Sequence, residues 1–207
     1  MRSQQPNNPW PHDMGITVDR LPASLALLLF VRSAWGLTGF SSIPPVVPAP
    51  DVGGSRRPDS PALDVWEARW RQAWDRAIAW YDVEDEKHQH PTPELMRSQS
   101  RPGQPLHPAL PPLWSDEYEF EGLDRQAFTR WFNSVRQKHL RPVEPSPERT
   151  CLPDLVEAWK TGLDTVIAMP YDGYYARRIT RRHIIVSDAT HEDPARFSSA
   201  LREATAS

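Results

Sequence analysis

Tyrosine and arginine side chains are concentrated in one short stretch near the end of the chain, residues 171–194 (YDGYYARRITRRHIIVSDATHEDP). Arginine guanidinium groups bind phosphates and carboxylates through paired hydrogen bonds, and tyrosine rings offer a face for stacking. A surface that recognises nucleic acid, another phosphate compound or an acidic protein would use such residues. The candidate binding residues are Tyr171, Tyr174, Tyr175, Arg177, Arg178, Arg181 and Arg182.

The same stretch contains residues that could perform acid–base chemistry. His183, Asp188 and His191 are near one another in sequence, at the expected end of a strand and in the turn after it. A histidine that is oriented by a carboxylate can move protons during a reaction. The sequence indicates no nucleophile and no metal-binding set beside them, and an acidic helix start also explains the run from His191 to Asp193.

A structural interpretation of the stretch stays open beside recognition and catalysis. In it, Ile179 and residues 184–186 are buried, and the four arginines stand on the solvent side of a sheet. The arginines would then pair with acidic residues, for which the segments 82–86 and 116–121 are the candidates. Net charge is −3, so nothing in the composition requires a polyanionic partner.

Two other segments contain residues that could bind a metal ion or act as a reactive thiol. His88 and His90 could bind a metal together with acids of residues 84–86, but chance surface histidines are the preferred interpretation. Cys151 could be activated beside Arg149, but no general base can be assigned, and a structural role is the preferred interpretation. A single cysteine excludes an intrachain disulfide and a cysteine-based metal site. No phosphate-binding loop or dinucleotide fingerprint is present, so we expect no metal and no cofactor.

Composition indicates a packed protein with long proline-rich connections. The 207 residues include 23 prolines and nine tryptophans, and a chain rich in tryptophan has the means to form a real core. The single cysteine is typical of a cytoplasmic protein. Only three of the 24 basic residues are lysine, which suggests a GC-rich bacterial genome.

The expected fold class is α+β, helix-rich, with a small sheet of two or three strands in the C-terminal third. Strands are expected at residues 165–169 and 183–187, with a third near 174–180 and an acidic edge strand at 116–123. The predicted organisation is a flexible segment 1–20, an apolar helix 21–40, a proline-rich linker 41–61 and a main α+β domain 62–207 that contains an irregular connection 82–116.

Apolar spacing and capping residues predict the helices. The run 21–31 is too short for a membrane span, which needs about 20 apolar residues, so we expect a buried helix that Gly36 or Gly39 ends. Ser60 and Pro61 are expected to start a helix whose tryptophans belong to the core rather than to a stacking site; these are Trp66, Trp70 and Trp74. Asp124 and Asp193 are expected to cap two later helices, with a further helix over 152–162.

Three functions remain open on the sequence alone. The first is a soluble, cytoplasmic, non-catalytic protein that acts through contacts with another protein, which the proline tracts and uneven charge favour. Two overlapping P-x-x-P matches over residues 105–111 add little weight, because such matches are common by chance. The second is a nucleic-acid or phosphate-binding accessory protein that uses the surface 171–183. The third is a small enzyme that uses His183, Asp188 and His191.

Overall fold

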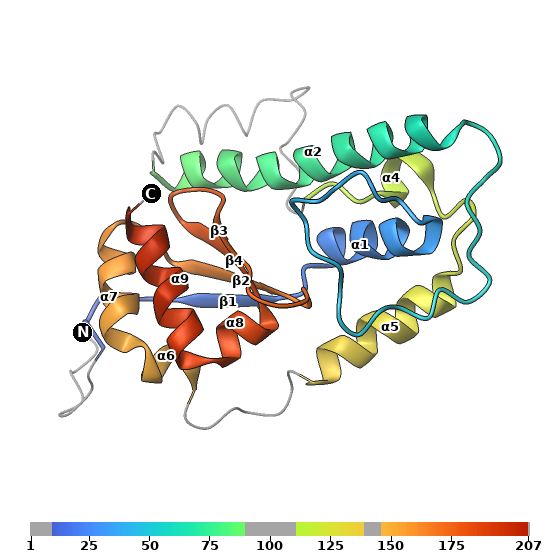
Figure 1. Ribbon diagram of the computed structural model, residues 1–207. Coiled ribbons are helices and arrows are strands. Elements are labelled where there is room, and N and C mark those ends of the chain that lie inside the picture. Colours follow the sequence, from blue (N-terminus) through green and yellow to red (C-terminus); the bar gives the residue numbers. More distant parts are fainter. Residues whose placement is uncertain (1–9, 90–110, 139–145, 207) are drawn as a thin grey trace. The chain divides into compact units, whose positions relative to one another are not determined.

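The computed structural model describes residues 10–89, 111–138 and 146–206, with the backbone alone for residues 83–89 (Figure 1). The chain divides into two compact units. One unit comprises Met1–Arg20 and His139–Ser207, and the other comprises Leu21–Lys138. Helices and one small mixed sheet make up the described part, so the predicted α+β class is confirmed.

The first unit contains a mixed sheet of four strands rather than the two or three that were expected. Three strands run parallel and the fourth is antiparallel to its neighbour. Two of the strands, TVIAM and HIIVS, are almost continuously apolar, which is typical of parallel strands that are buried on both faces. In the order β1-β2-β4-β3, the strands are β1 (Thr17–Arg20), β2 (Thr165–Met169), β4 (His183–Ser187) and β3 (Ala176–Arg178).

Helices cover one face of this sheet (Figure 1). A hydrophobic core lies between these helices and the sheet. Val166, Ile184 and Val186 point to that face, because side chains alternate along a strand. Leu155 and Phe197 of the covering helices pack against them, and both are completely buried. The helices of this unit are α6 (Pro147–Thr150), α7 (Leu152–Lys160), α8 (Asp188–Glu192) and α9 (Pro194–Ala206).

Strand β1 was not predicted. The flexible segment expected over residues 1–20 does not extend to Thr17–Arg20, which pairs in parallel with β2. The amide of Thr17 also donates to the carbonyl oxygen of Asp164 at 2.8 Å. The sequence TVDR alternates between exposed and half-buried side chains and carries two charges, so only its partner strand, far along the chain, identifies it as a strand.

Asp193 caps α9 as predicted, and its removal is expected to have a measurable cost. Its Oδ1 accepts hydrogen bonds from the amides of Ala195 at 2.9 Å and Arg196 at 3.1 Å. Asp193→Ala should lower the free energy of unfolding by about 1 kcal/mol, whereas Asp193→Ser should retain most of it. Urea denaturation at pH 7 measures both values; equal losses in the two variants would show that the cap contributes nothing.

In the second unit, the apolar run near the start of the chain forms a buried helix, as expected. Helix α1 (Ala23–Trp35) is buried from Ser24 to Arg32, and Gly36 ends it in a left-handed conformation with φ of 63°. Within the described residues, no helix combines the length and the apolarity that a bilayer crossing requires. The other helices of this unit are α2 (Leu63–Gln89), α4 (Ser115–Tyr118) and α5 (Arg125–Lys138).

The tryptophan row of α2 belongs to the core, as predicted. Trp66, Trp70 and Trp74 are at most 6% exposed. The indole nitrogen of Trp70 donates to the carbonyl oxygen of Leu28 at 2.6 Å, and the Trp70 and Trp74 rings stack with centroids 5.3 Å apart. These rings therefore hold α1 against α2 and leave no open face for a ligand.

Residues 116–123 are not a strand, and that prediction is wrong. Residues Ser115–Tyr118 form the short helix α4, followed by a turn. The tyrosine at 118 packs against Trp114, four residues earlier, with ring centroids 4.3 Å apart. That spacing is helical, and the Asp116 carboxylate closes the turn by accepting the Leu113 amide at 3.0 Å. The alternation of aromatic and acidic residues, which suggested a strand, occurs here in a short helix and the turn that follows it.

The boundaries of α2 also differ from the prediction. The helix begins at Leu63, two residues after Pro61, and continues to Gln89, past the expected end near residue 82. Residues 90–110 lie outside the described part of the chain, and with them the P-x-x-P matches. The side chains of the metal candidates His88 and His90 are also outside it.

Asp124 caps α5 as predicted, because its Oδ1 accepts the amides of Gln126 and Ala127.

Candidate functional site

The turn between β3 and β4 is organised by the hydroxyl group of Thr180. Its oxygen accepts the amides of Arg182 at 3.0 Å and His183 at 3.1 Å. The same oxygen lies 2.8 Å from Nδ1 of His183. Because a hydroxyl oxygen has two lone pairs and one proton, this hydroxyl donates to the ring, and Nδ1 carries no proton. The turn is therefore closed by three hydrogen bonds to one atom.

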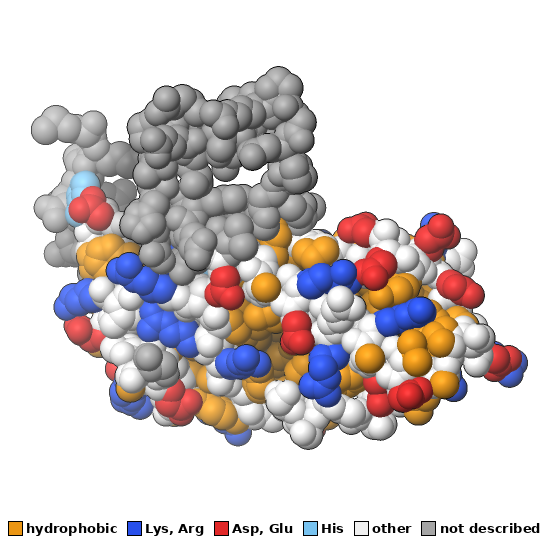
Figure 2. Space-filling view, turned by 90° about the horizontal axis from the view of Figure 1, so that it is seen from above, with side chains coloured by type: hydrophobic (Ala, Val, Ile, Leu, Met, Phe, Trp, Pro, Cys, Tyr) orange, Lys and Arg blue, Asp and Glu red, His pale blue; other side chains and the backbone are white. Residues whose placement is uncertain are grey.

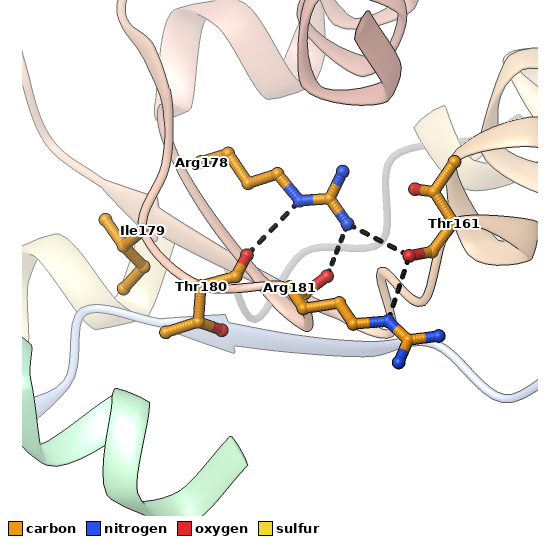
Figure 3. Close-up of a pocket in the computed structure, with 5 residues that line it drawn as sticks. All are labelled: Thr161, Arg178, Ile179, Thr180 and Arg181. Atoms are coloured by element: carbon orange, nitrogen blue, oxygen red, sulfur yellow. Dashed lines mark hydrogen bonds between the residues drawn. The ribbon is translucent and has the colours of Figure 1, made fainter. Parts of the chain in front are cut away.

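The side chain of Arg178 also stabilises the turn between β3 and β4. Its guanidinium group donates to four backbone carbonyl oxygens, two in the turn and two at helix ends, and Figure 3 shows three of these bonds. These carbonyls belong to Thr180 and Arg181 in the turn, Thr161 after α7 and Ala204 in α9. Hydrogen bonds to a charged donor are stronger than neutral ones. Arg178 therefore has a structural role and joins the turn to both covering helices.

Arg181 extends over a recess beside this clamp. Its Nε donates to the carbonyl oxygen of Thr161 at 3.3 Å, and Figure 3 shows its guanidinium group close to that of Arg178. Its terminal nitrogens make no hydrogen bond within the described residues. Gly162 permits the approach: its φ is +105°, and a Cβ atom there would lie 2.5 Å from Nε of Arg181. We call this recess, lined by Thr161, Arg178, Ile179, Thr180 and Arg181, the arginine recess.

The other two predicted arginines do not line the arginine recess. The Arg182 guanidinium binds the Asp164 carboxylate, with Nη2 and Oδ2 2.6 Å apart. Asp164 lies outside both acidic segments that the structural interpretation named. Arg177 is exposed and lies opposite Ile185, whereas Arg178 lies opposite Ile184. Adjacent strand residues point to opposite faces, so these two arginines are on different sides of the sheet.

The three tyrosines also serve other contacts. Tyr171 is 3% exposed and packs edge-to-face on Tyr175, with ring centroids 4.9 Å apart. The Tyr174 hydroxyl donates to the Glu203 carboxylate at 2.9 Å. Partial burial, followed by this carboxylate, raises the pKa of Tyr174 to about 12. Burial also raises the pKa of Tyr175. The seven predicted binding residues thus do not form one surface.

The predicted catalytic residues are separated by the length of a strand. His183 begins β4, while Asp188 and His191 follow its last residue, Ser187. The four residue steps of β4 span about 13 Å, so His183 cannot share a proton with the other two directly. The grouping of His183, Asp188 and His191 by sequence proximity therefore does not correspond to one site.

His191 instead belongs to a buried polar network. Its side chain is fully buried, and its Nε2 lies 2.9 Å from Oε1 of Glu148 in α6. Its Nδ1 lies 3.5 Å from Nη2 of Arg20, the last residue of β1. The bond from His191 holds the pKa of Glu148 at about 2 against the opposing effect of burial. Sequence reasoning missed both partners, since Glu148 is 43 positions away and Arg20 is 171.

The remaining thiol candidate, Cys151, has a structural explanation. Cys151 is 2% exposed and its Sγ donates to the carbonyl oxygen of Pro194 at 3.3 Å. Burial raises the pKa of the Cys151 thiol, which disfavours the reactive thiolate. Among the residues that the structure describes, no three metal-ligating side chains gather in one place.

Among the residues that the structure describes, the terminal nitrogens of Arg181 make no hydrogen bond, so the arginine recess has open donors. It can bind the oxygen atoms of a carboxylate or a phosphate, and its lining residues offer no acid or base for chemistry. No protein-family model, curated protein or solved structure matches the chain.

Proposed function

We propose that this is a non-catalytic, cytoplasmic accessory protein that binds an acidic segment of another protein in the arginine recess. The observation that supports the proposal most directly is the position of Arg181. One nitrogen holds its guanidinium group to the Thr161 carbonyl, and the terminal nitrogens are directed away from that bond. A guanidinium group held in this way can bind a carboxylate through two parallel hydrogen bonds.

The surroundings of Arg181 favour an anion and reduce the cost of binding it. The five lining residues include two guanidinium groups and no carboxylate. The Thr180 hydroxyl and the Arg178 clamp hold the turn in place before a ligand arrives. A preorganised site loses less conformational entropy on binding than a loose loop does.

An acidic protein segment fits the recess better than nucleic acid does. Binding to nucleic acid depends on neutralising several phosphates at once. Here Arg178 and Arg182 are engaged within the fold, and none of the three tyrosines lines the recess. On the face shown in Figure 2, basic and acidic side chains are interspersed and do not form a continuous basic tract. A single exposed arginine is sufficient for one or two carboxylates.

A labelled glutamate decapeptide tests the proposal. Fluorescence anisotropy at low salt should show saturable binding to the full chain, and Arg181→Ala should weaken it about fivefold or more, about 1 kcal/mol. The matched control is Arg196→Ala, which removes an exposed arginine of the same unit outside the recess. It should bind like the unmodified protein.

Two outcomes would contradict the proposal. Equal losses in Arg181→Ala and Arg196→Ala would mean that the peptide senses net charge alone. The second is the behaviour of a single-stranded oligonucleotide in the same assay. If it bound more tightly than the peptide and lost affinity with Arg181→Ala, the recess would belong to a nucleic-acid-binding protein instead.

A further inference from the structure

Helix α5 exposes a face that carries basic and neutral polar side chains and no carboxylate. The helix has 14 residues, which corresponds to a length of about 21 Å. Its opposite side is held in the core, where Trp131 packs beside Phe30 of α1 and its indole nitrogen donates to the Pro48 carbonyl oxygen at 3.0 Å. The exposed basic residues of the helix are Arg125, Arg130, Arg136 and Lys138.

Three amide side chains form a row along the middle of this face. The row consists of Gln126, Asn133 and Gln137, and all three are exposed. At about 100° per residue, their spacing keeps them within about 40° of one another around the helix axis. The same geometry places Arg125 and Arg136 on one side of the row and Arg130 on the other. Neutral hydrogen-bonding groups are thus flanked by positive charge on both sides.

The two arginines on the first side are positioned by aromatic rings. The guanidinium carbon of Arg125 lies 4.2 Å from the centroid of the Phe120 ring, and that of Arg136 lies 5.4 Å from the centroid of Phe132. A guanidinium group over a ring keeps its N–H donors available in its own plane. Within the described residues, neither group makes a hydrogen bond or an ion pair. Both can therefore donate to a ligand.

Carboxylates near the start of α5 compensate the charge of this face only in part. The Asp124 carboxylate accepts three backbone amides. The bonds from Ala127 and Gly54 lower the pKa of Asp124 most, and attraction to Arg130 contributes least. The two exposed glutamates of residues 119–121 precede the cap, and neither forms an ion pair with α5 among the described residues. The rest of the face, towards its C-terminal end, is basic.

A hollow on the first half of the face offers a place for a phosphate group. Its volume is about 370 Å³, and Arg125, Gln126, Thr129 and Arg130 line it. These residues come from successive turns of one helix, so their side chains are neighbours. Two guanidinium groups and an amide can donate to phosphate oxygens there, and none of the four lining residues carries a carboxylate.

We propose that α5 binds double-stranded DNA in the major groove. This groove is about 12 Å wide and admits an α-helix. Asparagine and glutamine amides bind base edges, and arginines bind phosphates. The amide row therefore faces the bases, while the arginines on its two sides reach the two phosphate backbones. The proposal does not depend on the arginine recess, since no residue of α5 lines that recess.

Duplex DNA fits this face better than a membrane surface or an acidic protein does. An interfacial helix must insert its apolar side into the lipid, but the apolar side of α5 is buried in the protein. An acidic protein would use the charges and leave the central amide row without a matching surface. The floor of the major groove supplies donors and acceptors for exactly such a row.

Fluorescence anisotropy with a labelled mixed-sequence duplex of about 20 base pairs tests the proposal on the full chain. At about 50 mM salt the Kd should be about 1–100 μM. Four basic residues should give a slope of about −3 to −4 for log affinity against log salt. The combined variant Arg125→Gln, Arg130→Gln and Arg136→Gln should bind at least tenfold more weakly, with a slope near −1.

The matched control removes the same charge from the other unit. The combined variant Arg149→Gln, Arg196→Gln and Arg202→Gln replaces three exposed arginines there and should keep the affinity within about twofold. Arg181→Ala should also leave duplex binding unchanged, so the outcome for α5 is separate from that for the arginine recess.

A second pair of variants tests the amide row itself. Asn133→Asp places a carboxylate in the row with little change of shape and should weaken duplex binding tenfold or more. Gln72→Glu makes the matching exchange at an exposed position of α2 and should leave the affinity unchanged. Urea denaturation verifies that each variant folds. If the variant with three glutamines in α5 does not fold, Asn133→Asp still decides.

Four results would overturn the proposal. The first is the absence of saturable duplex binding, and the second is an equal loss of affinity in the α5 variants and their controls. The third is a single strand of the same length that binds as tightly as the duplex, because a single strand has no major groove. The fourth is tight binding to vesicles of equal parts phosphatidylserine and phosphatidylcholine that depends on the same three arginines, since the face would then belong to a membrane-binding protein.

Discussion

Arg178→Ala is expected to lower the free energy of unfolding by about 3 kcal/mol, because one side chain satisfies four carbonyl oxygens. A single hydrogen bond to a charged group contributes about 1.5–3 kcal/mol. Water can replace part of the loss, since Arg178 is only half-buried. The loss should appear in urea denaturation as a lower midpoint with an unchanged slope.

Two comparisons distinguish a clamp from a surface charge. Arg178→Lys should recover less than half of the lost stability, because an ammonium group cannot reach carbonyls in four directions with fork geometry. Arg181→Ala should change stability by less than about 0.5 kcal/mol, since its side chain makes one long hydrogen bond. A stable Arg178→Ala protein would show that the clamp contributes little and that the turn is held by Thr180 alone.

The pair of Glu148 and His191 is expected to make stability depend on pH in the acid range. The pKa of Glu148 is lowered from 4.5 to about 2 in the folded protein. A carboxyl group with a depressed folded pKa stabilises the fold above its unfolded pKa, and this stabilisation is lost as pH falls through the folded value. The contribution should therefore be complete above about pH 5 and absent below about pH 2. Its size is no more than about 3 kcal/mol.

Removal of either partner separates this contribution from general acid denaturation. His191→Phe should lower the stability at pH 7 by about 2–3 kcal/mol, and the deficit should shrink towards pH 3 as Glu148 becomes protonated. Glu148→Gln should remove the same part of the pH dependence. Urea denaturation at a series of pH values measures both. A deficit in His191→Phe that stays constant from pH 7 to pH 3 would contradict the assignment.

Local patterns predicted the elements whose neighbours in sequence are also their neighbours in space. Strands β2 and β4 were predicted with their observed bounds, because each contains a short run of apolar and β-branched residues between clear breaks. The capping residue Asp193 and the buried tryptophans of α2 also follow from spacing within one helix. These features need no information about distant segments.

Features that depend on a distant partner could not be predicted. Strand β1 is a strand only because β2 pairs with it, and a short charged sequence carries no such signal. For the stretch 171–194, the residue types were evident, but the directions in which the side chains point could not be predicted. Alternation places Arg177 and Arg178 on opposite faces, and carbonyl groups of α7 and α9 engage Arg178. In the arginine recess, the terminal nitrogens of Arg181 make no hydrogen bond to any residue that the structure describes.

The arginine recess is tested most directly by nuclear magnetic resonance of the arginine side chains. The Nε–Hε signals of ¹⁵N-labelled full-length protein would be followed while the glutamate decapeptide is added, with Arg181→Ala used to assign its signal. The Arg181 signal should shift first and furthest, and that of Arg196 should stay in place. An unmoved Arg181 signal at peptide concentrations that saturate the anisotropy assay would contradict the central claim, because the carboxylates would then bind elsewhere.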